Sequence, residues 1–87
     1  MTVFMVERDL KGITMEGLAE AQKAAIRTAE GMTGQGMPIR YIRSTFAPDD
    51  GRCMCLFEAE TEALVKELND TAGIPYHRVV PALDLTP

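Results

Sequence analysis

Two cysteines separated by one residue are the most reactive feature of this sequence. Cys53 and Cys55 flank Met54 in a segment of β-forming residues. Because alternate strand residues share a face, the two thiols are predicted to lie on one side of a strand, about 6.8 Å apart. A soft metal ion could bridge them with modest adjustment. The alternative is that both thiols pack as small hydrophobic side chains beside Phe57.

The only histidine, His77, follows Pro75 and Tyr76 in a connection before the last predicted strand. An imidazole exposed there could serve as a metal ligand or a proton carrier near neutral pH. The alternative interpretation is an ordinary surface residue, because no second histidine stands at ligand spacing.

Periodicity and turn residues predict the elements that must position these side chains. Helices are predicted after the N-caps Thr14 and Thr61, the first with a buried stripe reaching Met32 and the second ending at Gly73. The glycines between residues 31 and 38 predict a flexible connection. Strands are predicted at residues 2–9, 39–46, 53–59 and about 78–85.

The order β-α-β-β-α-β predicts a single α+β domain over residues 1–87, a ferredoxin-like sandwich. If each β-α-β crossover is right-handed, both helices cover one face of an antiparallel sheet of strand order 4-1-3-2. Pro81 lies within the last predicted strand, and a proline is tolerated at a sheet edge because it has no N–H to donate. The predicted order places that strand at an edge.

The predicted central strands are apolar on both faces, although two helices can cover only one. A homodimer that packs sheet against sheet, in an assembly of the dimeric α/β barrel type, would cover the second face. The competing explanation is a pocket for an apolar ligand on that face, lined by Met5, Glu7 and their neighbours.

The predicted strand order also brings several metal-binding side-chain types to one end of the sheet. The end of the first strand lies beside the starts of the third and fourth strands, so Glu7 and Asp9 approach Cys53 and His77. Such a mixed site suits a borderline divalent transition ion, with water or a second subunit completing the coordination. Alternatively, Glu7 and its neighbour Arg8 form an ion-paired strand end. The candidate metal ligands are therefore His77, Glu7, Cys53 and Cys55.

Composition argues against several classes of function. The net charge is −4 and no cluster of Lys and Arg follows a phosphate backbone, so no nucleic acid partner is predicted. No apolar run approaches the roughly 20 residues that span a bilayer, and the N-terminus lacks a secretory pattern, so a cytoplasmic location is predicted. No motif indicates an organic cofactor, and no arrangement of residues identifies an enzyme.

Several short motifs in a fixed order carry a family resemblance. They are Val6-Glu7-Arg8, the helix after Thr14, Ser44, Leu56-Phe57-Glu58-Ala59, and Gly73-Ile74-Pro75 followed by Arg78-Val79. Together they cover nearly the whole chain, which resembles the small nickel-binding, ferredoxin-like family first catalogued as a domain of unknown function. The resemblance implies a homodimer that binds and sequesters nickel rather than catalysing a reaction. It transfers no ligand set, and one histidine excludes a histidine-rich nickel site within one chain.

Three functional hypotheses follow. The first is a protein that binds or sequesters a divalent transition metal, nickel being the candidate. The second is a cofactor-free small-molecule-binding protein or enzyme of the dimeric α/β barrel type, with Glu7, Tyr41, Arg43 and Ser44 near its pocket. A structural or regulatory dimer without a ligand is the third.

Overall fold

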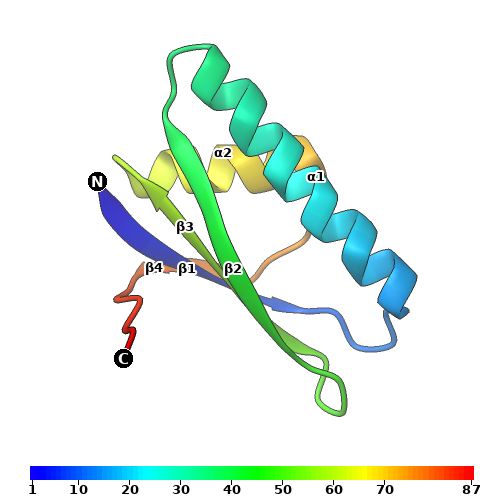
Figure 1. The fold of residues 1–87 in the computed structure, drawn as a ribbon. Coiled ribbons are helices and arrows are strands. Elements are labelled where there is room, and N and C mark those ends of the chain that lie inside the picture. Colours follow the sequence, from blue (N-terminus) through cyan, green and yellow to red (C-terminus); the bar gives the residue numbers. More distant parts are fainter.

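Four strands form one antiparallel sheet in the order β2-β3-β1-β4 (Figure 1). This order is the predicted 4-1-3-2 order read from the opposite edge, so the predicted topology is confirmed. The computed structural model describes all residues from 1 to 87. Its elements are β1 (Thr2–Asp9), α1 (Met15–Gly34), β2 (Ile39–Ala47), β3 (Arg52–Ala59), α2 (Glu62–Ala72) and β4 (Arg78–Pro81).

The hydrophobic core lies between the two helices and one face of the sheet. Alternate residues of the central strands, Phe4 and Val6 on β1 and Phe57 on β3, point towards the helices and are almost fully buried. On α2, Val65 and Leu68 are completely buried against them. The side-chain period of two in each strand therefore assigns one face to the core.

Helix α1 ends at Gly34, just beyond Met32, the last residue of its predicted buried stripe. The side chain of Thr14 accepts a hydrogen bond from the Gly17 amide at 2.9 Å and caps its first turn, as expected. The helix then continues through Gly31 to Gly34, where the sequence indicated a flexible connection. Met32 is buried against the core, and this packing outweighs the weak helix propensity of the two glycines.

Helix α2 begins and ends where its capping residues predict. Thr61 accepts a hydrogen bond from the Leu64 amide at 3.3 Å. At the other end, Gly73 adopts the left-handed conformation with φ 71°, which closes the helix without a Cβ clash. The chain then turns through Pro75 towards β4.

Strand β4 is shorter than predicted, ending at Pro81 instead of near residue 85. Pro81 pairs with Phe4 on β1, and the Ala82 amide still donates to the Val3 carbonyl at 2.9 Å. Because β1 begins at Thr2, little strand is left to pair with the residues that follow. Pro81 does lie on an edge strand, as predicted.

The sheet face away from the helices carries half-buried apolar side chains and three ion pairs. The apolar side chains are Val3, Met5, Met54, Leu56 and Val80. The ion pairs join Arg40 to Glu58, Arg43 to Asp84 and Arg78 to Glu7. Since Asp84 follows β4 and Arg43 lies on β2, at the opposite edge, the C-terminal tail reaches across this face.

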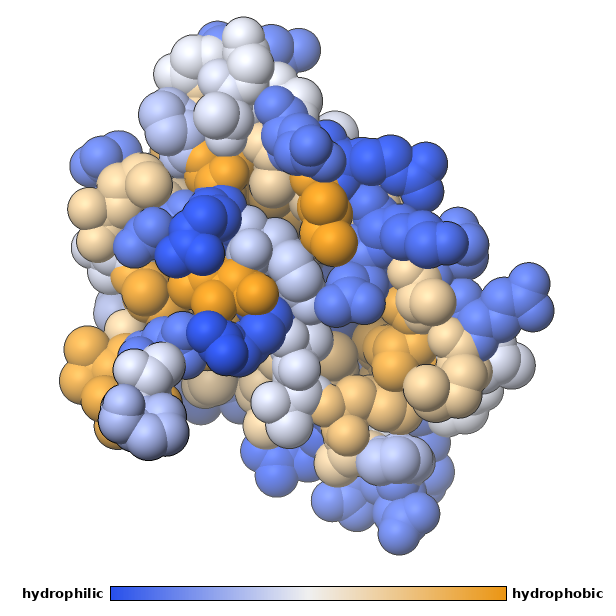
Figure 2. Space-filling model, in the orientation of Figure 1, coloured by the Kyte–Doolittle hydropathy of each residue, from blue (hydrophilic) through white to orange (hydrophobic).

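Hydrophobic residues also reach the outer surface. Figure 2 shows them as separate areas surrounded by hydrophilic residues rather than as one continuous patch. Neither helix has the length and apolarity needed to cross a lipid bilayer.

Candidate functional site

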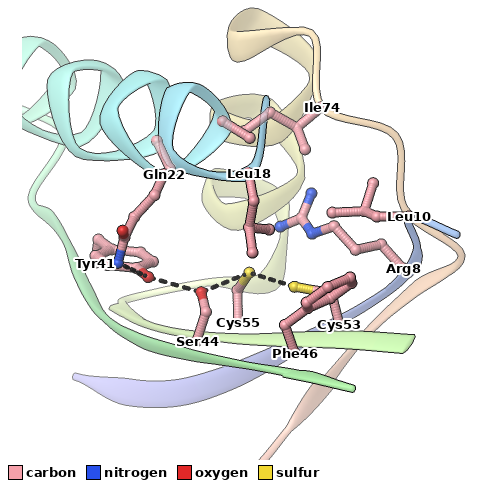
Figure 3. Close-up of a pocket in the computed structure, with 12 residues that line it drawn as sticks. Arg8, Leu10, Leu18, Gln22, Tyr41, Ser44, Phe46, Cys53, Cys55 and Ile74 are labelled. Atoms are coloured by element: carbon pink, nitrogen blue, oxygen red, sulfur yellow. Dashed lines mark hydrogen bonds between the residues drawn. The ribbon is translucent and has the colours of Figure 1, made fainter. Parts of the chain in front are cut away.

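A cavity of about 180 Å³ lies between α1 and the sheet (Figure 3). Its lining is mainly hydrophobic, with Leu18 on α1, Phe46 on β2 and Ile74 after α2. The polar groups in its wall come from three strands and from α1. They are Arg8, Gln22, Tyr41, Ser44, Cys53 and Cys55.

An irregularity in β2 turns both Tyr41 and Ser44 towards this cavity. In a regular strand, residues three apart point to opposite faces. Here Tyr41 pairs with Phe57 and Arg43 with Leu56, so Ile42 is an extra residue opposite β3. The resulting bulge restores Ser44 to the helix-covered face, where its partner is Cys55.

Cys53 and Cys55 lie side by side on β3 at the wall of the cavity. Both are free thiols with exposed fractions of 2% and 8%. Their sulfur atoms are 3.8 Å apart, closer than the rise of the strand alone would place them, because the side chains lean towards each other. The predicted common face of the two thiols is confirmed.

A chain of hydrogen bonds ends on the Cys55 sulfur (Figure 3). Gln22 Nε2 donates to the Tyr41 hydroxyl at 2.9 Å, and the Tyr41 and Ser44 hydroxyls are 2.7 Å apart. Ser44 Oγ donates to Cys55 Sγ at 2.9 Å, so its own oxygen is free to accept from Tyr41. With the Cys53 thiol as a second donor, the Cys55 sulfur is the acceptor at which the network converges.

This environment favours the thiolate form of Cys55. The hydrogen bond from Cys53, the positive charge of Arg8 and the hydrogen bond from Ser44 lower the pKa of Cys55 from 9.0 to about 6, against the opposing effect of burial. The same hydrogen bond, together with burial and the charge of Cys55, raises the pKa of Cys53. The pair therefore holds one proton in the neutral pH range.

Arg8 enters the cavity from β1, where it pairs with Cys53 across the sheet. Only 3% of it is exposed. Its guanidinium donates to Asn69 Oδ1 at 2.8 Å and to the Pro75 carbonyl at 3.3 Å, whereas its Nε–H has no partner. None of the ion pairs of the chain includes Arg8. It is a buried positive charge without a carboxylate, and its expected ion pair with Glu7 is not formed.

The four predicted metal ligands do not form one cluster. Glu7 pairs with Met54, so its side chain lies on the face opposite the cysteines, where it pairs with Arg78. The His77 amide donates to the Glu7 carbonyl at 2.7 Å, and the imidazole is exposed to solvent. No three His, Cys, Asp or Glu side chains form a group able to hold a metal ion. The role of these residues as ligands stays a prediction.

The cavity lies on a different face from the pocket expected from the sequence. That pocket was predicted beside Met5 and Glu7, between the sheets of two subunits, and a single chain does not test it. The cavity of the single chain is instead under α1. Arg8 could have been recognised as one of its residues, because it continues the alternation of Phe4 and Val6.

Comparisons with known proteins agree with this fold. A solved structure, that of SCO4226 from Streptomyces coelicolor A3(2), is similar with a TM-score of 0.79 and 20% identity, covering 98% of this chain and 99% of that one. At this identity the likeness concerns the fold. No curated protein matches the chain. A family model described as nickel responsive protein SCO4226-like matches residues 4–81. This match confirms the resemblance to a small nickel-related family, and the chain belongs to the SCO4226-like family of nickel responsive proteins.

Proposed function

We propose that this protein binds and sequesters nickel or another divalent transition metal ion through the sulfur atoms of Cys53 and Cys55. The observation that carries the proposal is the 3.8 Å separation of the two sulfurs on one strand. The family's description as nickel responsive supports a metal-related role.

The sulfur separation suits a shared metal ion. A tetrahedral ion holding both sulfurs at about 2.3 Å would separate them by about 3.8 Å, and a square-planar ion, a geometry common for nickel, would need about 3.3 Å. The first arrangement needs no movement, whereas the second needs a small rotation of the side chains. Thiolate is also the ligand form, which Cys55 adopts near neutral pH.

Two sulfurs supply only half of a four-coordinate set. Other groups must complete it, and water entering the cavity would do so. Glu7 lies on the sheet face opposite the sulfurs and His77 is exposed to solvent, so the proposal assigns them no part in the sulfur site.

The test is calorimetric titration of untagged, chelator-treated protein with nickel, zinc, cobalt and copper ions, followed also by the charge-transfer absorption of metal-bound thiolate. We expect saturable binding that is lost in Cys53→Ser and Cys55→Ser. His77→Ala and Glu7→Gln are the matched controls and should retain it. Loss of binding in His77→Ala, with retention in both serine variants, would refute the sulfur site. The candidate site would then be the sheet end where the end of β1 lies beside the start of β4.

A further inference from the structure

We propose that the cavity under α1 binds a small organic anion, whose carboxylate pairs with Arg8 and whose apolar part lies against Leu18 and Phe46. This site is distinct from the sulfur site in its chemistry, because its anchor is a cation and its ligand carries the negative charge. It goes beyond metal binding and does not depend on it.

The first argument is the unpartnered guanidinium nitrogen of the buried Arg8 side chain. A buried guanidinium without a carboxylate is unusual, because removing a charge from water is unfavourable unless a partner compensates it. Asn69 and Pro75 accept from two of its nitrogens but bring no charge, and the Cys55 thiolate brings a charge but leaves the Nε–H without an acceptor. The third nitrogen, Nε, is buried and unpartnered in a residue that lines the cavity. A carboxylate oxygen is the acceptor best suited to a guanidinium nitrogen without a partner.

The second argument is the size and lining of the cavity. A cavity of about 150 Å³ in another protein holds a benzene molecule. At about 180 Å³, this cavity has room for one small ring or branched chain together with a carboxylate. Leu18, Phe46 and Ile74 provide an apolar wall beside the charge, as in many pockets for small ligands.

The third argument is the way the structure holds Arg8 in place. Asn69 is fully buried and donates through Nδ2 to the Val65 carbonyl at 2.8 Å, which fixes its Oδ1 towards Arg8. The guanidinium is thus held in one orientation before any ligand arrives. Preorganisation of this kind raises affinity because less conformational freedom is lost on binding.

The test uses benzoate as the probe and neutral benzamide as its isostere, with metal-free protein, calorimetry and amide chemical shifts. We expect saturable benzoate binding about ten- to a hundredfold tighter than that of benzamide, the ratio typical of a charge-assisted hydrogen bond. Shift changes should concentrate at Leu18, Phe46 and Cys55. Equal binding of the two compounds, or none, would overturn the proposal.

Two variants locate the ligand. Arg8→Met should weaken benzoate binding at least tenfold, with exposed Arg52→Met as the charge-matched control. Ala21→Phe should block the cavity while Arg8 remains, and Ala19→Phe, on the exposed side of the same helix, should not. If Arg8→Met fails to fold, Ala21→Phe decides the question, since unchanged binding in that variant would exclude the cavity.

A third variant separates this proposal from the sulfur site. The double variant Cys53→Ser, Cys55→Ser should lose nickel binding and bind benzoate at least as tightly as wild type, because the Cys55 thiolate that repels a carboxylate near neutral pH is removed. Loss of both ligands in a folded double variant would refute an independent anion site. Retained nickel binding would count against the sulfur site and leave the anion site standing.

Discussion

At the scale of residues, one buried cation organises the site. Arg8 is held by Asn69 and Pro75, and its charge is among the causes that lower the pKa of Cys55. The cysteine pair and Arg8 thus form one electrostatic unit under α1. The titration of Cys55 in this unit can be measured without knowing any ligand.

Cys55 should titrate well below an ordinary thiol. We expect the ultraviolet absorbance of thiolate in the native, metal-free protein to rise by one group per chain with a midpoint near pH 6. Removing the positive charge in Arg8→Met should raise this midpoint, and so should removing the donor in Cys53→Ala. A native midpoint near 9, unchanged in both variants, would contradict the assigned environment.

The same shift has a consequence for stability. Because the folded pKa of Cys55 lies below its unfolded value, the thiolate stabilises the fold fully above about pH 9 and loses this contribution as pH falls through about 6. The raised pKa of Cys53 acts oppositely above pH 9. Denaturation of wild type and of Cys55→Ser should therefore diverge as pH rises from 6 towards 9.

Asn69 should contribute more to stability than an average residue. Replacing it by Ala removes the hydrogen bond to Arg8 and leaves a buried charge less satisfied, so we expect a loss of about 2 to 3 kcal/mol in the free energy of unfolding. Exposed Thr71→Ala on the same helix should change stability by less than about 0.5 kcal/mol. Chemical denaturation checks both, and equal effects would contradict the role given to Asn69.

At the scale of elements, two local irregularities position the site. The bulge in β2 turns Ser44 towards Cys55, and the turn between β2 and β3 brings Gly51 against the chain after β1. The Leu10 amide donates to the Gly51 carbonyl at 2.7 Å, which ties that turn to a residue of the cavity wall. The bulge and the turn therefore set the backbone positions of side chains that surround Arg8.

Gly51 should not tolerate a side chain. Its φ is 79°, and a Cβ there would lie 2.4 Å from the Lys11 Cα, a backbone atom that cannot move freely. Gly51→Ala should therefore destabilise the protein by about 2 kcal/mol or more in thermal or chemical denaturation. Gly31→Ala is the contrasting control, because it lies in α1 with open space around it and should stabilise by up to about 1 kcal/mol. Similar effects at both glycines would refute this explanation.

At the scale of the whole molecule, the sheet face away from the helices is the part of the fold whose apolar side chains the single chain leaves incompletely buried. Its side chains Val3, Met5, Met54 and Leu56 are only half-buried, and Leu83 and Leu85 on the tail are 80% and 83% exposed. Apolar area of this kind is typically covered by a partner. The homodimer expected from the sequence stays a prediction that this face supports.

Light scattering should give twice the mass of one chain if two copies pack through this face. Leu56→Glu would place a charge in the middle of the interface and should convert the protein to monomers. Ala63→Glu, exposed on α2 at the other side of the molecule, should leave the mass unchanged. A monomeric wild type, or a Leu56→Glu variant that remains dimeric, would contradict packing through this face.

Much of the fold follows from local physical chemistry. Thr14, Thr61 and Gly73 place the helix ends, and strand alternation places Cys53 and Cys55 on one face. Chain order and handedness then leave few arrangements for the sheet, which is why the strand order was predictable. The C-terminal ends of α1 and β4 were not, because α1 continues past Met32 to Gly34, where glycines indicated a connection, and the start of β1 limits the pairing of β4.

The sequence by itself determined the elements, the strand order, the common face of the two thiols and the family. Only the tertiary structure decided which side chains meet. The separation of Glu7 from the cysteines depends on strand register. The contact between Tyr41 and Ser44 depends on a bulge at Ile42. The burial of Arg8 beneath α1, with no carboxylate as a partner, depends on how α2 and the following loop pack. These relations join residues distant in the chain, so no local periodicity encodes them.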